Sequence, residues 1–153
     1  MKILIVSDSH GHDLLLRDLV KQYPNMDYYL HAGDSQSSMM SIYPFDSVKG
    51  NCDYFDFDVK RKIYTPKGYL LMKHFPTISK GEIEDIKFFI HGHTHKYQCY
   101  KENNYYVICP GSIALPRDGT LGSYAILEIN EKESIVTIYE LDSKNILIRM
   151  KIM

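Results

Sequence analysis

The segment FIHGHTHKY places three of the chain's seven histidines at alternate positions: His91, His93 and His95. A second polar cluster, DSHGH, follows a short apolar run near the N-terminus and contains Asp8 and His10. Imidazole nitrogens and carboxylate oxygens together suit borderline divalent metals such as Mn²⁺, Fe²⁺, Ni²⁺ and Zn²⁺. The two clusters therefore indicate a metal centre, provided that the fold brings them together.

Further ligand-type residues follow other apolar runs. Asp34 ends HAGD, Asn51 ends KGN, and His74 follows GYLLMK, so that all seven histidines fall at the ends of predicted strands. A glycine directly precedes Asp34, Asn51 and His93, where it would let the backbone approach a crowded site. Ligands bind beyond the carboxyl ends of strands in open α/β sheets. The number of ligand-type residues implies two cations rather than one.

The elements that must position these residues are α/β at the start of the chain. KILIVS is typical of a buried strand, and DLLLRDLVKQY repeats apolar residues at helical spacing until Pro24. DYYLHAGD and DSVKGN predict two short strands, with a helix around residues 39–43 between them. The alternating DYFDFDV, residues 53–59, predicts a half-exposed strand.

Antiparallel β-structure follows. KIYTPKGYLLMKH predicts a hairpin turning at residues 66–68, GEIEDI leaves room for a short helix, and KFFIH predicts a short strand. YQCYKENNYYVICP and SYAILEINEKESIVTIYEL predict two more hairpins, and NILIRMKIM predicts a last strand. We expect the C-terminal strands to leave an exposed sheet edge.

Composition narrows the class of protein. With 153 residues, 44% of them hydrophobic, the chain is expected to form a single domain over residues 1–153. A net charge of −1 and a pI near 6.6 provide no basic stripe for nucleic acid. MKILIVSD is too short for a signal or a membrane span, and three scattered cysteines suit a reducing compartment. We therefore expect a cytoplasmic protein without a membrane partner, and the charge does not indicate nucleic-acid binding.

Taken in order, the motifs resemble a known family. DSH, GD, GN, a strand-end histidine, GHTH and PGSIALPR are similar to the calcineurin-like metallophosphoesterases, in particular their small bacterial and archaeal phosphodiesterase branch. Each motif alone is weak, but their order over about residues 1–117 is specific. The resemblance implies an α/β fold in which two mixed β-sheets pack as a sandwich flanked by helices.

The resemblance also implies a ligand set and a reaction. Asp8, His10 and His95 would hold the first metal, and Asn51, His74 and His93 would hold the second. Asp34 would bridge the two metals. Asp34 and Asn51 are also the expected catalytic residues. The implied activity is hydrolysis of a small phosphodiester by a hydroxide that bridges two divalent metals, with Mn²⁺ expected first and Fe²⁺, Ni²⁺ or Zn²⁺ as alternatives.

Two other functions are compatible with the motifs. A phosphomonoesterase or protein phosphatase would use the same metals. The same fold also serves as a non-catalytic protein-interaction scaffold in the retromer complex.

Individual residues also have structural interpretations. Asp8 could cap the helix that follows it, Asp34 and Asn51 could form turns, and His74 could pack beneath Phe75, where the family usually has glycine. His91 is expected to support the site rather than bind metal.

One departure concerns the proton donor. Many relatives have histidine after the ligand asparagine, but this chain has Cys52, which leaves no obvious acid for the leaving group. His12 and His31 have no assigned role and are the nearest alternative donors.

Overall fold

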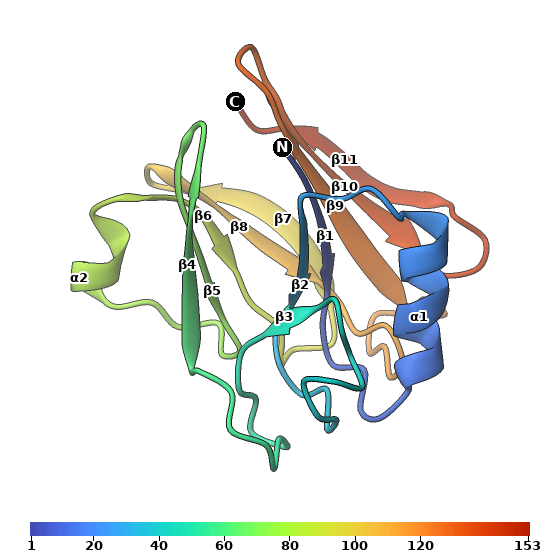
Figure 1. The fold of residues 1–153 in the computed structure, drawn as a ribbon. Helices are drawn as coiled ribbons and strands as arrows, with labels where there is room; N and C mark the ends of the chain where they lie inside the picture. Colours follow the sequence, from blue (N-terminus) through green and yellow to red (C-terminus); the bar gives the residue numbers. More distant parts are fainter.

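The computed structural model describes residues 1–153 as two β-sheets packed face to face, with a helix outside each sheet (Figure 1). The elements in chain order are β1 (Lys2–Val6), α1 (Asp13–Gln22), β2 (Tyr28–His31), β3 (Asp46–Ser47), β4 (Lys60–Thr65), β5 (Gly68–Lys73), α2 (Lys80–Ile83), β6 (Ile86–Ile90), β7 (Tyr97–Glu102), β8 (Tyr105–Pro110), β9 (Ser123–Ile129), β10 (Ser134–Glu140) and β11 (Ile146–Lys151). The expected sandwich of two mixed β-sheets flanked by helices is confirmed.

Both sheets mix parallel and antiparallel strands. The six-stranded sheet has the order β11-β10-β9-β1-β2-β3, in which β1, β2 and β3 are parallel and the remaining pairs are antiparallel. The five-stranded sheet has the order β4-β5-β6-β8-β7, in which β5, β6 and β8 are parallel. The last strand, β11, lies at a sheet edge, as the sequence predicted.

The apolar alternation of the strands builds the main core between the sheets. Ile3 and Ile5 of β1 face Met72 of β5 and Phe88 and Ile90 of β6 in one buried cluster. A second cluster lies on the other face of the six-stranded sheet, where the apolar stripe of α1 packs. With apolar residues on both faces, β1 is buried except at Lys2.

The parallel strands direct their carboxyl ends to one end of the sandwich, at the bottom of Figure 1. The loops after β1, β2, β5 and β6 meet there, whereas the N- and C-termini lie at the opposite end. This arrangement brings residues from distant parts of the chain to one place.

Two predicted elements are wrong. Residues 53–59 form a loop rather than a strand, because the side chain of Asp53 binds backbone amides of the loops and Phe57 turns into the cluster beneath α1. Residues 39–43 form turns rather than a helix, since this short segment is closed by turn bonds such as Ser41 N to Ser38 O (3.1 Å) and is followed by Pro44.

None of the helices in the structure has the length and apolar character needed to cross a membrane.

Candidate metal centre

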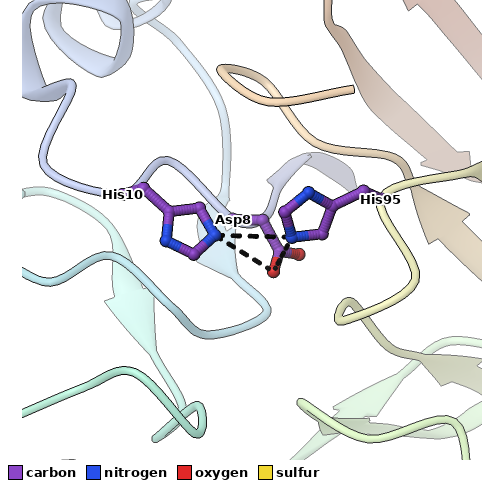
Figure 2. A group of neighbouring side chains, drawn as sticks. All are labelled: Asp8, His10 and His95. Atoms are coloured by element: carbon purple, nitrogen blue, oxygen red, sulfur yellow. Dashed lines mark hydrogen bonds and ion pairs between the residues drawn. The ribbon is translucent and has the colours of Figure 1, made fainter. Parts of the chain in front are cut away.

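Three of the predicted ligands converge from the two sheets. Asp8 follows β1, His10 lies two residues further on, and His95 lies in the loop after β6. Asp8 Oδ1 lies 3.1 Å from His95 Nε2 and 3.8 Å from His10 Nε2, and the two imidazole nitrogens are 3.4 Å apart. Figure 2 shows the three side chains pointing toward one another. We call Asp8, His10 and His95 the first ligand group.

The opposite ring nitrogens set the tautomers of these histidines. His95 Nδ1 donates to the carbonyl of Leu115 (2.6 Å), and His10 Nδ1 donates to the side-chain oxygen of Gln36 (2.8 Å). A neutral imidazole that donates from Nδ1 has its lone pair on Nε2. Both lone pairs therefore face the Asp8 carboxylate, an arrangement that is repulsive without a cation between them.

Asp8 provides a direct test of whether a cation fits. Its Oδ2 accepts hydrogen bonds from the Ser7 hydroxyl and from the backbone N–H of His93 (3.0 Å). Its Oδ1 is buried and accepts no hydrogen bond, and it is one of only two such buried side-chain atoms in the protein. An unpartnered buried carboxylate oxygen is costly, and a bound cation would satisfy it.

The remaining predicted ligands form a second group beside the first. His74 Nε2 lies 2.9 Å from Asn51 Oδ1 and 3.3 Å from Asp34 Oδ2, and His93 Nδ1 lies 3.1 Å from the same Asn51 oxygen. His74 Nδ1 donates to the carbonyl of Ala32 (2.8 Å), which directs Nε2 toward the other ligands. We call Asp34, Asn51, His74 and His93 the second ligand group.

The two groups are continuous. Ligand atoms of Asp8, Asp34 and His74 all lie within 4.8 Å of one another, so the carboxylates connect the two halves. The amide of Cys52 donates to Asp34 Oδ1 (2.8 Å) and leaves Oδ2 directed toward His74. This placement of Asp34 is compatible with a bridging role.

The pKa values of both carboxyl groups are lowered. Burial opposes ionisation of Asp34, but the His74 side chain and the Cys52 amide outweigh it and lower the pKa to about 2. Burial likewise opposes ionisation of Asp8, whose pKa is lowered by His95 and Ser7. Both groups are therefore carboxylates at neutral pH.

The backbone at the site is unusual. Nine non-glycine residues of the chain have positive φ, and five of them are predicted ligands: Asp8 (52°), His10 (44°), Asp34 (59°), His93 (68°) and His95 (58°). Positive φ is uncommon for such residues, and strained conformations cluster at functional sites. Asp8, His10, His93 and His95 therefore do not continue the strand alternation of the runs that precede them. These residues lie in loops beyond β1 and β6.

Two glycines allow the loops to approach this closely. A Cβ at Gly50 would overlap the carboxylate of Asp34, and a Cβ at Gly92 would overlap the hydroxyl of Ser7 and Asp8 Oδ2, at 2.7 Å. The close approach anticipated from the sequence is present at both positions.

Asp53 is a supporting residue that the sequence interpretation missed. Its carboxylate accepts hydrogen bonds from the amides of Asp34 (2.9 Å), Gln36 (2.8 Å) and Gly50 (2.7 Å). One buried side chain thus ties the loop carrying Asp34 to the loop carrying Asn51. The only sequence signal for Asp53 was that it ends GNCD, residues 50–53, next to the predicted ligand Asn51. Residue spacing alone does not indicate that its side chain links two loops.

Ser112, in the PGSIALPR motif, fixes the backbone around Asp8 and His95 on the other side of the centre. Its hydroxyl donates to the carbonyl of Asp8 (2.8 Å) and accepts from the amide of Leu115 (2.8 Å). Leu115 in turn orients His95.

The other histidines have structural environments. His31 is fully buried, donates from Nε2 to Ser9 Oγ (2.8 Å) and accepts at Nδ1 from the Gly33 amide (3.1 Å). Burial lowers its pKa to about 4. His91 is buried, and its Nδ1 donates to the carbonyl of Gly92 (2.9 Å). Both rings lie behind the ligand loops rather than within either ligand group.

Several structural interpretations are resolved. Residue His12, not Asp8, occupies the position before α1, and its ring is exposed. His74 does pack edge-on against Phe75, with ring centroids 5.3 Å apart, while its Nε2 faces Asp34 and Asn51. The packing and ligand interpretations of His74 are therefore compatible.

Cys52 lies at the edge of the centre. Its sulfur is within 4.8 Å of ligand atoms of His10 and Asp34. Burial and then the charge of Asp34 raise the pKa of the thiol. Cys52 is therefore protonated at neutral pH, but it is a weaker acid than an imidazolium.

The chemistry of these donors fits divalent cations. Together the two groups offer two carboxylates, one amide oxygen and four imidazoles, and one carboxylate oxygen lacks any protein donor. Such mixed oxygen and nitrogen ligands suit borderline divalent metals. The first group is largely buried, whereas Asn51 is exposed and gives access from solvent.

Comparisons with known proteins agree with this geometry. Residues 1–132 match the model of the calcineurin-like phosphoesterase superfamily domain. The chain is 32% identical over 157 residues to YsnB of Bacillus subtilis, named a probable metallophosphoesterase, with 92% of this chain and 91% of the relative covered.

Solved structures share the fold. A predicted phosphoesterase from Streptococcus pneumoniae superposes with a TM-score of 0.83 at 22% identity, covering 98% of this chain and 97% of the other. A structure described as a novel archaeal phosphodiesterase has a TM-score of 0.63 at 19% identity, covering 99% of each chain.

Proposed function

The chain belongs to the calcineurin-like phosphoesterase superfamily, a family of metal-dependent phosphoester hydrolases, and from this premise we propose that it is a dinuclear metal-dependent phosphodiesterase. The observation that carries the proposal is the pair of adjoining ligand groups joined by Asp8 and Asp34, with Asp8 Oδ1 left without a protein donor. Two groups of this composition provide places for two cations.

The residues of the chain have distinct roles in this proposal. Asp8, His10 and His95 would hold one cation, Asn51, His74 and His93 would hold the other, and Asp34 would contact both. When bound, two divalent cations supply Lewis-acid activation of water and stabilise the oxygens of an in-line phosphoryl displacement. Asp34 and Asn51 would orient the reacting groups, because the oxygens of both side chains converge on His74 Nε2.

A diester is the proposed substrate class. The centre offers no strong acid to protonate a leaving group. Cys52, beside the ligand groups, is a weak acid, and both ring nitrogens of His31 are already hydrogen-bonded. The archaeal phosphodiesterase with the same fold supports the choice of a diester. Mn²⁺ is the first choice of metal because each group includes a carboxylate oxygen and the second adds the amide oxygen of Asn51.

The test is metal reconstitution followed by hydrolysis assays. Metal-free protein is loaded separately with Mn²⁺, Fe²⁺, Ni²⁺ and Zn²⁺, its metal content is measured, and each form is assayed on an aryl diester and the matching aryl monoester. We expect two metals per chain and faster cleavage of the diester with Mn²⁺.

The other outcomes identify the alternative functions. Faster cleavage of the monoester would identify a phosphomonoesterase. Failure to bind any of these metals would overturn the proposal and favour the non-catalytic scaffold.

A further inference from the structure

Phe75 is an exposed aromatic side chain at the mouth of the second ligand group. Its ring centroid lies 4.8 Å from that of His93 and 5.3 Å from that of His74. Although His74 is only 1% exposed, Phe75 is 45% exposed. The phenylalanine therefore covers the two ligand histidines with one part of its ring and presents the remainder to solvent.

The segment carrying Phe75 is held in place. The carbonyl of His74 accepts a hydrogen bond from the amide of Gly92 (3.0 Å), and Lys73 Nζ donates to the carbonyl of Thr77 (2.9 Å). Pro76 restricts the backbone of the residue before it to extended conformations. A flat apolar surface on such a segment loses little conformational entropy when a ligand stacks on it.

We propose that Phe75 is a specificity-determining residue that stacks against a flat aromatic ring on the substrate, either an aryl group or a nucleobase attached to the phosphate. The inference rests on the proposed function, because the ring must adjoin a phosphate held at the ligand groups. Stacking on an exposed aromatic surface requires no charged side chain. This suits a chain with a net charge of −1 and no basic stripe.

Phosphonates with the same head group isolate the effect of the ring. Phenylphosphonate and methylphosphonate are compared as competitive inhibitors of diester hydrolysis by the Mn²⁺-loaded wild-type protein and by Phe75→Leu. We expect the wild type to prefer phenylphosphonate and Phe75→Leu to reduce that preference about three- to tenfold. Adenosine monophosphate, tested in parallel, distinguishes a nucleobase from an aryl group as the preferred ring.

A positioning role for Phe75 predicts a different result. If Phe75 only holds His74 and His93 in place, Phe75→Leu should weaken binding of both phosphonates equally and lower metal affinity. That result, or an unchanged preference, would overturn the inference. Tyr64→Leu is the control, because Tyr64 is an exposed aromatic residue near the opposite end of β4 from the ligand loops and should leave the preference unchanged.

A binding measurement separates this inference from the proposed function. The chain has no tryptophan, so Phe75→Trp introduces a single tryptophan, which can be excited selectively over the tyrosines, and retains a stacking surface. We expect phenylphosphonate, but not methylphosphonate, to change its emission in the metal-loaded protein, whereas Tyr64→Trp should not respond. Emission that does not discriminate between the ligands contradicts the stacking role. A protein that hydrolyses no diester but shows the selective response would overturn only the proposed activity.

Discussion

At the scale of single residues, the candidate metal centre consists of side chains whose acceptor atoms point toward one another. Hydrogen bonds to the rest of the protein hold the opposite atom of these side chains. His10, His74 and His95 each donate from Nδ1 to an oxygen behind them, and their Nε2 atoms face the junction. Asp8 uses Oδ2 for protein donors and leaves Oδ1 bare. While the imidazoles are neutral, no protein donor reaches between these groups, so the geometry orients them for a cation.

Asp34→Asn tests the proposed bridge. The amide retains an oxygen that can accept from the Cys52 amide, so the metal-free fold should persist, but the lost negative charge should weaken both cation positions. Loss of an outer-shell partner already costs about 10- to 100-fold in metal affinity or activity, and we expect a loss of at least that size here.

Metal content by elemental analysis and diester hydrolysis should fall together in Asp34→Asn. Asp56→Asn is the control, because the Asp56 side chain is fully exposed and its one ion pair is with Lys49, at 3.7 Å. Two retained metals with full activity would eliminate Asp34 as the bridge.

His74→Ala tests the second ligand group. Removing the imidazole that lies beside Asp34 and Asn51 should leave one tightly bound metal, in the first ligand group. Most hydrolysis should be lost, because one cation does not stabilise both the attacking and the leaving oxygen of the displacement. Metal titration monitored by calorimetry measures the stoichiometry. Unchanged stoichiometry would leave His74 with only its packing role against Phe75.

Cys52 predicts the dependence of rate on the leaving group. General-acid assistance is typically worth about 10² to 10⁴ in rate, and the raised pKa of this thiol makes it a poor donor. Across a series of aryl and alkyl diesters, we expect log rate to fall steeply as the leaving-group pKa rises. Cys52→His should flatten the slope.

A flat slope in the wild type would reveal another proton donor. His12 is exposed and His31 is buried with both ring nitrogens hydrogen-bonded, so His12→Ala would be the first variant to examine.

At the scale of elements, the ligands are carried by loops at strand ends, and buried polar side chains set the geometry of those loops. Asp53 accepts hydrogen bonds from backbone amides of the loop after β2 and of the loop after β3. Hydrogen bonds of the Ser112 hydroxyl connect the segments after β1 and β8. Positive φ at five predicted ligands carries a local cost that these hydrogen bonds offset.

Asp53→Ala should therefore damage both stability and metal binding. It leaves the amides of Asp34, Gln36 and Gly50 without their acceptor, for which we expect a loss of about 2–4 kcal/mol in the free energy of unfolding. Chemical denaturation measures this change. Asp56→Ala, in the same loop but fully exposed, should change stability by less than about 0.5 kcal/mol. Equal effects of the two substitutions would contradict the role of Asp53.

At the scale of the whole molecule, the centre joins the two sheets. Asp8 and Asp34 follow strands of the six-stranded sheet, whereas His74 and His95 follow strands of the five-stranded sheet. We propose that residues 1–153 fold as one domain, because neither sheet alone contains either complete ligand group.

Metal binding should consequently stabilise the entire fold. At a free metal concentration about 100 times Kd, mass action adds about 2.7 kcal/mol, which corresponds to roughly 5–10 °C in Tm for a chain of this size. Calorimetry with and without chelator measures the shift. An unchanged Tm under saturating metal would contradict a centre that joins the sheets.

The metal-dependent shift should also depend on pH. In the metal-free protein the pKa of His95 is raised chiefly by Asp8, and the pKa of His74 is raised by Asp34 and Asp8 despite burial. Protons therefore stabilise the metal-free fold below pH 6.5, and this stabilisation is lost as pH rises through the raised pKa values. Because metal competes with these protons, the Tm difference should shrink below pH 6.5 and grow above it. A difference independent of pH would contradict this competition.

The sequence by itself determined the family, the layout of most strands and the residues that converge. The helical spacing of DLLLRDLVKQY produced α1, and the hairpin turning at residues 66–68 formed as predicted, because these signals are local. Residues 53–59 had a local strand pattern, but contacts with distant residues prevailed. Asp53 is recruited by two loops, and Phe57 is buried beneath α1. Residues 39–43 had a local helix pattern, but this short segment forms turns closed by local hydrogen bonds before Pro44.

Only the tertiary structure decided how the ligand residues meet. Positive φ at Asp8 and His95, the bare Oδ1 of Asp8 and the exposed face of Phe75 all depend on neighbours far away in the chain. Sequence spacing specifies which residue types follow each strand. The direction of each side chain is determined by long-range hydrogen bonds and by the packing of one sheet on the other, which a local pattern does not encode.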